Sequence, residues 1–497
     1  MLVPIIFTLD TILSNMSQVW MFYKAITYAK RNNWPVIAQE DYFLKYEQQK
    51  KLFPYFFEEN TAKTFHYDIP SEEDIKKIYQ IRIPNKIIET YIANAGSQTD
   101  AYIESFKSDW PEMESFLVHE IDLYEKCGFK IDGFICLSHL KFVSNVARKL
   151  DKKVFYMEWS PFRYSVYRNA AYFDLNDSYL EYYNRYQAFY ANSYDVPILS
   201  SKDILALFLN REYYNLLDKS FEENIYEIGI AGTYNNVVET RAYTNYDILE
   251  ELNHANKIFC DSGIVVRYHP GDPIKAKVQC NSMEGGTLFE FICKCKRIMS
   301  INSNVEFEAM LLGKPVYDES IFSRYKGFTN NSLNSLEDIT ISDEAINFIT
   351  FVVFAPFELI DCDEYIRFRL SEPSDYELYK YHLDYYIHSI GLTNELFNKP
   401  KSEWFGEIVK AKNANKSNKM EFSNKNDLVS LNAEVNRLKN VISLLEEENE
   451  KNTIIIDELH KINCTQEEQI NGLKNSISMR LTKPMRILGD LLAKNRF

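Results

Sequence analysis

VRYHPGDP at 266–273 and IMSINSNVEFEAMLLGKPV at 298–316 are the two stretches of the chain that decide its fold. The apolar runs at 264–268 and 297–301 have the length and composition of buried parallel strands. Small polar residues follow each run, and a helical pattern then continues from the second run to Gly313. Because ligands of open α/β sheets bind at the carboxyl ends of the strands, both polar clusters are predicted to line one ligand site.

The side chains at these strand ends are typical of a site for a nucleotide sugar. Arg267 and His269 alternate onto one face of their strand and would hold an anion, although a histidine at a strand end can also serve only to cap a loop. The helix opens with three small polar residues, Asn302, Ser303 and Asn304. Its free N–H groups favour a phosphate, and an ordinary N-cap is compatible with that interpretation. Glu308, one turn into the helix, could reach a ribose diol.

The first half of the chain also alternates between strand and helix patterns. Residues 2–8 and 34–40 are predicted strands joined by a helix, and the alternation resumes after a charged, aromatic stretch with helical spacing at 40–125. The chain is therefore predicted to be an α/β protein with two Rossmann-like domains. These are an N-terminal domain with a helical insertion at 1–195, expected on the acceptor side, and a C-terminal, nucleotide-sugar-binding domain at 196–410.

Two further strand ends carry residues suited to chemistry. Glu158 closes a strand and is followed by an aromatic loop with Arg163, which suits a general acid or base with a raised pKa. A salt bridge from Glu158 to Arg163 or Arg168 is the structural alternative. The segment GIAGTYNN at 229–236 runs from a strand into a turn, where its two glycines would let a ligand approach the backbone.

The composition excludes some classes of function. A net charge of −15 argues against nucleic acid as a partner, because binding to its backbone needs a basic face. The eight cysteines show no metal-ligand spacing, and no motif of the chain implies a metal. With no recognisable signal peptide, the chain is expected to be cytoplasmic with reduced thiols.

The C-terminal part has a different pattern. A polar linker is predicted at 411–427, and heptads with β-branched residues at a and leucine at d predict a coiled coil at 428–475, typical of a parallel dimer. A helix packed on its own domain is the alternative. Residues 476–497 combine a basic face with an apolar one, which predicts an amphipathic helix on an anionic membrane surface rather than a soluble tail.

Over residues 130–330 the chain resembles the bacterial retaining β-Kdo transferases of capsule and lipopolysaccharide synthesis. The resemblance rests on six motifs that occur in order: EWSPFR (158–163), YFDLNDSYLE (172–181), GIAGTYNN (229–236), RYHP (267–270), SNVEFEAMLLGKPV (303–316) and IFSRYKGFT (321–329). The sequence SISMRLTKPMR at 476–486 also resembles a tail segment of glycosyltransferases of bacterial surface polysaccharides.

The resemblance implies a GT-B-like fold and the transfer of Kdo from CMP-Kdo to a lipid-linked glycan, with no metal or other cofactor. Glu158 would be the acid/base, His269 would contact CMP, and Ser303 with Glu308 would form the nucleotide-binding element.

The family's aspartate nucleophile falls at Asn236, and an amide cannot form the covalent glycosyl intermediate of a double displacement. Glu239 could serve instead. Thr233 of the same turn and Arg163 are further residues predicted to bind the nucleotide sugar.

The sequence thus predicts a cytoplasmic glycosyltransferase that lies on the inner face of the cell membrane and forms homo-oligomers through its coiled coil. Two alternatives stay open. One is a catalytically silent coiled-coil scaffold of a polysaccharide-assembly complex, which Asn236 keeps in play. The other is a GT-B enzyme that uses a different nucleotide sugar.

Overall fold

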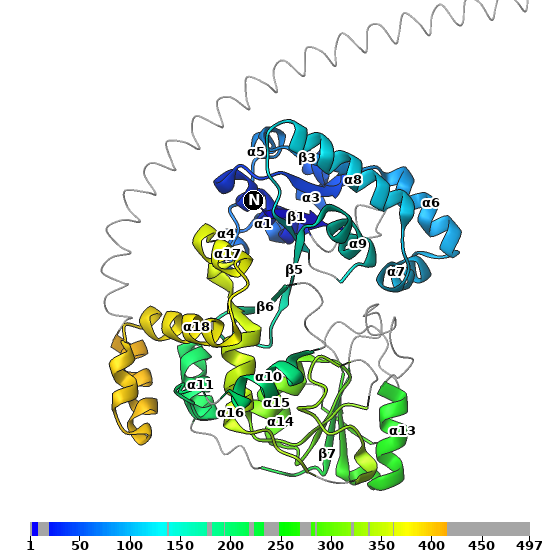
Figure 1. Ribbon diagram of the computed structural model, residues 1–497. Helices are drawn as coiled ribbons and strands as arrows, with labels where there is room; N and C mark the ends of the chain where they lie inside the picture. The colour runs from blue at the N-terminus through cyan, green and yellow to red at the C-terminus, as the bar shows by residue number, and fades with distance from the viewer. Residues whose placement is uncertain are drawn as a thin grey trace, which may run out of the picture. The chain divides into compact units, whose positions relative to one another are not determined.

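The computed structural model describes most of the chain up to residue 414 (Figure 1). The described residues are 2–7, 19–136, 139–175, 181–192, 194–217, 223–232, 248–268, 280–283, 286–319, 323–335, 338–360 and 362–414. The chain divides into two compact units, Met1–Asn413 and Ala414–Phe497. The predicted coiled coil at 428–475 and the basic tail at 476–497 lie outside the described residues.

The first unit contains a seven-stranded sheet in the order β12-β6-β5-β4-β1-β2-β3. Its strands are β1 (Leu2–Ile6), β2 (Val36–Gln39), β3 (Gln80–Ile83), β4 (Gly133–Cys136), β5 (Lys153–Trp159), β6 (Ala170–Leu175) and β12 (Phe354–Pro356). The run from β3 to β5 is parallel, whereas β6 and β12 are antiparallel to their neighbours. The order 3-2-1-4-5 within the parallel part is that of a Rossmann-like sheet, which places a ligand-binding edge at the carboxyl ends of β1 and β4.

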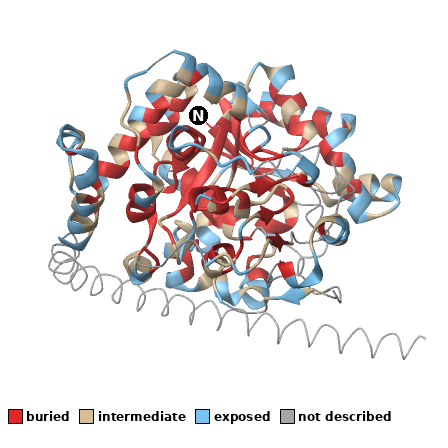
Figure 2. Ribbon diagram, turned by 90° about the horizontal axis from the view of Figure 1, so that it is seen from below, coloured by how far each residue is buried: buried red, intermediate tan, exposed pale blue. Residues whose placement is uncertain are grey.

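Apolar side chains cover both faces of this sheet, as its long apolar strands require. One face packs against α1 through residues such as Phe22 and Ile26, and the other packs against α8 and α9 through Leu117 and Val143. The helices around this sheet are α1 (Val19–Asn32), α2 (Glu40–Leu44), α3 (Tyr46–Leu52), η2 (Pro54–Phe57), α4 (Glu59–Phe65), α5 (Glu72–Lys77), α6 (Asn85–Ala95), α7 (Gln98–Lys107), α8 (Pro111–Lys126) and α9 (Lys141–Leu150). In Figure 2 the strands at the centre are buried, and the outer faces of the helices are exposed.

A second, five-stranded sheet has the order β11-β10-β7-β8-β9, and all of its neighbouring strands are parallel. Its strands are β7 (Ile228–Ala231), β8 (Ile264–Arg267), β9 (Asn281–Ser282), β10 (Ile298–Met299) and β11 (Val316–Tyr317). Counted along the chain, this order is again 3-2-1-4-5, so the second sheet is also Rossmann-like. The mixed α/β class with parallel sheets, and the strands predicted at 264–268 and 297–301, are confirmed.

The remaining helices pack around the second sheet and between the sheets. They are α10 (Tyr182–Ala191), α11 (Ser201–Phe208), η4 (Arg211–Leu216), α13 (Ile248–Ile258), η5 (Asp261–Gly263), α14 (Leu288–Cys293), α15 (Asn304–Leu311), η6 (Leu333–Ser335), α16 (Asp343–Phe348), the π-helical η7 (Ile349–Val353), η8 (Phe357–Leu359), α17 (Asp363–Leu370), α18 (Asp375–Ser389) and η9 (Asn394–Asn398). α15 begins at the predicted residue and is followed by Gly313 with φ +71°, a backbone conformation that glycine adopts without strain.

Three strands of the first sheet differ from the sequence prediction. β3 lies inside the stretch 40–125 that was predicted to be helical, and β6 follows β5 directly. β12 pairs with β6 in the first sheet although it falls within 196–410, so the yellow segment of Figure 1 returns to the first sheet after the second one is complete. These strands are only three to six residues long. Their pairing is decided by partners far along the chain, which a local pattern does not reveal.

Gly229 has a structural role that the sequence did not suggest. A Cβ atom added at Gly229 would lie 2.4 Å from Sγ of Cys295 and 2.9 Å from the ring of Phe291. Both of these side chains are buried. The glycine therefore makes room for α14 and the residues after it, rather than for a ligand as predicted.

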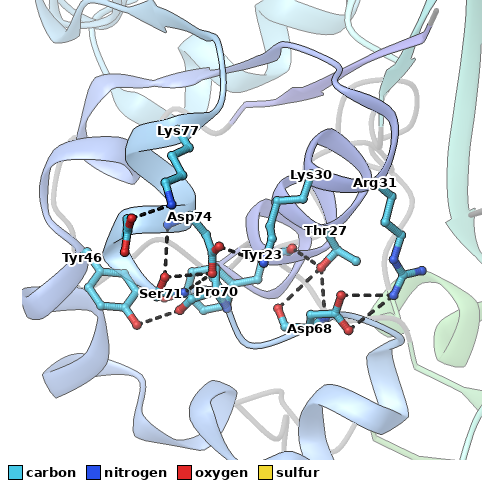
Figure 3. Close-up of polar contacts among 11 residues, drawn as sticks. Tyr23, Thr27, Lys30, Arg31, Tyr46, Asp68, Pro70, Ser71, Asp74 and Lys77 are labelled. Carbon is cyan, nitrogen blue, oxygen red and sulfur yellow. Dashed lines mark hydrogen bonds and ion pairs between the residues drawn. The ribbon is translucent and has the colours of Figure 1, made fainter. Parts of the chain in front are cut away.

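Polar contacts hold the loop between α4 and α5 against α1 (Figure 3). Asp68 accepts a hydrogen bond from Arg31 at 3.1 Å, and its backbone N–H donates to Thr27 Oγ1 at 2.9 Å. Lys30 forms an ion pair with Asp74, whose carboxylate also completes a capping box with Ser71 at the start of α5. These contacts hold the loop after α4 and the start of α5 against α1.

A half-buried lysine near the end of the described residues holds the last helix against α11. Residues 401–414 are helical, so the helix extends over the first four residues of the predicted linker at 411–427. Lys412 Nζ donates to the carbonyl groups of Ala206 and Leu207 at 3.0 Å and to that of Leu209 at 2.6 Å. These carbonyls are at the carboxyl end of α11, where a cation satisfies groups that the helix itself leaves without partners. No helix within the described ranges is long and apolar enough to cross a membrane.

Candidate functional site

Glu158 forms an ion pair with a residue that the sequence analysis did not single out. Its Oε2 lies 2.6 Å from Nη2 of Arg324, which is 7% exposed at the side chain, against 40% for Glu158. Arg168, one of the two expected partners, pairs with Glu358 instead at 2.9 Å. The pair joins the carboxyl end of β5 to the loop after β11, 166 residues further along the chain.

Three elements meet around this ion pair. The Arg324 guanidinium lies 4.3 Å from the ring centroid of Tyr172 on β6. The Tyr172 hydroxyl contacts the hydroxyl of Tyr325 and donates to Asn304 Oδ1 at 3.1 Å. Asn304, the first residue of α15, donates from Nδ2 to the carbonyl of Trp159 at 3.1 Å. The strand ends of the first sheet and the helix start of the second are thereby held in one network.

Two backbone N–H groups at the start of α15 donate hydrogen bonds to carboxylates. The sequence predicted that N–H groups in this segment would be free to bind a phosphate. Ser303 N donates to Glu306 Oε1 at 2.6 Å, and Asn302 N donates to Asp318 Oδ2 at 3.0 Å. Ser303 and Glu306 form a capping box, the ordinary N-cap that was the compatible alternative. These two N–H groups therefore have protein acceptors, and the binding of a nucleotide sugar at the start of this helix stays a prediction.

Glu306 and Asp318 form a buried pair of carboxyl groups beneath the start of α15. They are 0% and 2% exposed, and the two side chains share a hydrogen bond. Burial, followed by the charge of Asp318, raises the pKa of Glu306 well above its usual value. Sequence reasoning passed over Glu306 in favour of Glu308, although the spacing Ser-x-x-Glu is a recognised capping signal.

Glu308 lies on the same helix in a separate contact. Its Oε2 accepts a hydrogen bond from the hydroxyl of Tyr167 at 3.0 Å, and the side chain is half-buried. Burial raises the pKa of Glu308 to about 7, against the opposing effects of Tyr167 and the charge of Arg163. Arg163 is exposed and donates from Nε to the carbonyl of Ser160 at 3.0 Å. Glu308 lies on the same helix as Asn304. It forms, with Tyr167 and Arg163, a second polar group beside the Asn304 network.

The other predicted site residues lie elsewhere or outside the described ranges. Arg267 is at the end of β8, where its Nη2 donates to the carbonyl of Gly286 at 3.1 Å. Four predicted residues fall outside the described residues: Thr233, Asn236, Glu239 and His269. In the part of the chain that the structure describes, no three His, Cys, Asp or Glu side chains are grouped so as to hold a metal ion.

Comparison with known proteins connects the first sheet with a family of glycosyltransferases. Residues 14–178 match the sequence model of the glycosyltransferase 99 family N-terminal domain. This range includes Glu158 and the motif at 158–163. The match confirms the resemblance to a glycosyltransferase family that the motifs indicated.

Solved structures similar to this chain include two Kdo transferases. The β-Kdo 2,4 transferase KpsC of Thermosulfurimonas dismutans is 13% identical, with a TM-score of 0.32 over 44% of this chain and 78% of that one. The β-Kdo 2,7 transferase KpsC of the same organism is 16% identical, with a TM-score of 0.29 over 45% and 77%. The UDP-GlcNAc 2-epimerase of Methanocaldococcus jannaschii is 14% identical, with a TM-score of 0.28 over 75% and 100%. No curated protein matches the chain in sequence.

The buried carboxyl pair predicts how stability depends on pH. The folded chain keeps a proton on Glu306 that the unfolded chain releases above its ordinary carboxyl pKa, so the stabilising contribution is complete at acidic pH and falls as the pH rises. Glu306→Gln keeps an acceptor for Ser303 N but cannot ionise. We expect the variant to lose less stability than the wild type as the pH rises above the ordinary carboxyl pKa of 4.5 in chemical denaturation.

Glu377→Gln is the matched control. Glu377 forms the same capping box with Ser374 at the start of α18, but it is exposed and its hydrogen bonds to Ser374 lower its pKa. The ionisation of Glu377 therefore changes the stability only at acidic pH. At higher pH the stability of Glu377→Gln should depend on pH with the same slope as that of the wild type. Equal slopes for Glu306→Gln and wild type would refute the protonated pair.

Proposed function

We propose that the chain is a glycosyltransferase of bacterial surface polysaccharide synthesis that transfers Kdo from CMP-Kdo to a lipid-linked glycan. The observation that carries this proposal is the ion pair of Glu158 and Arg324, with its support from Asn304. It joins three of the motifs that resemble β-Kdo transferases, and these motifs come from both Rossmann-like sheets. The family match over residues 14–178 supports the glycosyltransferase class, and the donor and acceptor are inferred from the motifs.

Glu158 is the proton acceptor in this proposal. Its carboxylate is 40% exposed and lies at the carboxyl end of β5, where ligands of α/β sheets bind. The nucleophile first bonds to the anomeric carbon while the electrons of the C–O bond to phosphate leave with CMP. A hydroxyl oxygen of the acceptor then bonds to the anomeric carbon, its proton passes to Glu158, and the electrons of the glycosyl–enzyme bond return to the nucleophile. Arg324, relieved of its carboxylate partner, is then available to the carboxylate of Kdo.

Glu308 is proposed to bind the ribose of the donor. It needs its ionised form to accept hydrogen bonds from two hydroxyl groups, and Tyr167 with Arg163 favours that form. The covalent step of a retaining mechanism would fall to the turn that contains Asn236 and Glu239. Since Asn236 cannot serve as the nucleophile, Glu239 is the residue proposed for it, and a catalytically silent scaffold is the alternative function.

Replacement of Glu158 by glutamine tests the catalytic proposal. Glutamine can still accept a hydrogen bond from Arg324 but cannot take up a proton, so transfer of radiolabelled Kdo should fall by about 10²- to 10⁴-fold. CMP release and glycan labelling are measured with CMP-Kdo and an isolated lipid-linked acceptor.

Glu358→Gln provides the control, because Glu358 is paired with Arg168 in an ion pair outside the network. Transfer by this variant should remain near the wild-type rate. Absence of donor binding, hydrolysis and transfer in the wild type would favour the scaffold.

The role of Glu308 predicts a pH dependence of donor binding. Because its pKa is raised to about 7, the carboxylate becomes available as the pH rises through neutrality, and the KM for the donor should fall over that range. Tyr167→Phe removes a hydrogen bond that favours the ionised form, so the transition should move to higher pH. Glu308→Gln should make the donor KM independent of pH there. A wild-type pH profile retained in Glu308→Gln would assign the titration to another group.

The C-terminal part is proposed to place the enzyme at the inner membrane surface. The sequence of 476–497 favours binding to anionic lipid, and dimerisation through 428–475 would strengthen it because two weak anchors then act together. Deletion of 476–497 should move the protein from the membrane fraction to the soluble fraction of a cell lysate. Unchanged partitioning would show that the segment is not the anchor.

A further inference from the structure

The helix at 401–414 holds the end of α11 through a single side chain. Lys412 donates hydrogen bonds from Nζ to three carbonyls, those of Ala206, Leu207 and Leu209. An ammonium group has three N–H donors, so all of them are used at this one place. The bond to Leu209, the residue that follows α11, is the shortest at 2.6 Å.

The chain at the end of α11 is paired with the segment that carries Tyr167. Leu209 and Tyr167 form an isolated antiparallel bridge. Backbone hydrogen bonds of 2.7 Å and 2.8 Å join the segments 166–168 and 208–210 on either side of it. The side chain of Asn210 donates a further hydrogen bond to the carbonyl of Tyr167 at 3.2 Å. Whatever holds the end of α11 therefore also fixes the backbone of Tyr167.

Ring packing supports the same connection. Tyr167 is 4% exposed, and its ring centroid lies 5.3 Å from that of Phe162. Phe162 in turn stacks on Phe208, the last residue of α11, with a centroid separation of 4.0 Å. Because buried rings are close-packed and have little room to move alone, a displacement at the end of α11 reaches Tyr167 through side chains as well as through the backbone.

Tyr167 ends this series of contacts at the residue proposed to bind the ribose. Its hydroxyl donates to Glu308 Oε2 at 3.0 Å. A hydrogen bond donated to a carboxylate favours the ionised form, which is the form that ribose binding requires. Lys412 is thus connected to Glu308 through the carbonyl of Leu209, the paired segments and the hydroxyl of Tyr167.

Both ends of this connection titrate near neutral pH. Burial, followed by the charges of Arg168 and Arg211, lowers the pKa of Lys412 to about 7, and burial raises the pKa of Glu308 to about 7. The groups that face Lys412 are Arg168, Arg211 and Tyr214, and those that face Glu308 are Tyr167 and Arg163. Since a pH profile of the whole protein would combine the two titrations, a test has to follow Glu308 itself.

We propose that Lys412 is a positioning residue for donor binding, which acts through Leu209 and Tyr167 to keep Glu308 in its hydrogen bond. The identity of the ligand as a nucleotide-sugar donor rests on the proposed function. The helix at 401–414 leads into the unit Ala414–Phe497, so the connection runs from the start of that unit to the donor site.

The direct test follows the titration of Glu308 in the full chain without substrate. Carbon-13 NMR of labelled glutamate carboxyl groups, with Glu308→Gln to assign the signal, gives the midpoint of this titration. Lys412→Met should move the midpoint to higher pH by about half to one pH unit, because the bond from Tyr167 is loosened. Lys410→Met is the matched control, since it removes an exposed lysine from the same helix and should leave the midpoint unchanged.

A double variant shows whether Lys412 acts through Tyr167. Tyr167→Phe deletes the hydroxyl group and should itself raise the midpoint. Lys412→Met added to Tyr167→Phe should then cause no further shift. Additive shifts would assign the effect to the charge of Lys412 and overturn the proposal, as would an unchanged midpoint in Lys412→Met. Lys412→Gln, which keeps a donor group, serves as the milder variant if Lys412→Met does not fold, and should shift the midpoint in the same direction.

Donor binding gives the functional measurement. In calorimetric titrations with CMP-Kdo at about pH 7, Lys412→Met should bind about twofold to fivefold more weakly than Lys410→Met, which is the loss of ionised Glu308 that the expected shift causes. In transfer assays the donor KM should rise while kcat changes little. Unchanged affinity despite a shifted midpoint would refute the role in donor binding. A wild type that binds no CMP-Kdo would sink the proposed function, whereas the shifted midpoint would still connect Lys412 to Glu308.

Discussion

The ion pair between Glu158 and Arg324 is the contact on which the rest of the candidate site depends. Arg324 is almost completely buried, and a buried cation is tolerated only with a partner of opposite charge and further polar or aromatic contacts. Glu158 supplies the charge, and the ring of Tyr172 supplies an electron-rich face. Because the two partners belong to segments far apart in the chain, satisfying this one cation also brings the first sheet against the loop after β11.

Two carboxylates accept hydrogen bonds from backbone N–H groups at the start of α15. Glu306 and Asp318 accept hydrogen bonds from the N–H groups of Ser303 and Asn302, and burial raises the pKa of Glu306. This arrangement fixes the orientation of Asn304, whose amide bridges Tyr172 and Trp159. The helix start thus acts as a structural support for the strand end that carries Glu158. An anionic ligand would have to rely on side chains such as Arg324 and Arg163.

Two consecutive residues of β5 place a carboxylate and an indole on opposite faces of the first sheet. Glu158 and Trp159 are consecutive on β5, yet one joins the ion pair while the other stacks on Phe357. The alternation of side chains along a strand separates the two environments over a single peptide unit.

Local sequence was enough to predict the parallel core strands, because β1, β8 and β10 are apolar runs bounded by polar residues. It also located the start of α15 and indicated the family resemblance. It failed for β3, β6 and β12, which are short and become strands only through their neighbours. It also missed Arg324 and Glu306. Nothing in a linear pattern distinguishes a surface arginine from one buried against Tyr172, or shows that a capping glutamate will meet Asp318.

What the sequence by itself determined is the set of strands and helices with strong periodicity and the residue types available at their ends. What only the tertiary structure decided is which of those residues meet. Glu158 is paired with Arg324 rather than Arg163 or Arg168, and Gly229 makes room for Cys295 rather than for a ligand. The physical reason is common to these cases. Hydrophobic periodicity acts over a few residues, whereas the burial of a charge or a side chain is settled by whichever distant group fills the space around it.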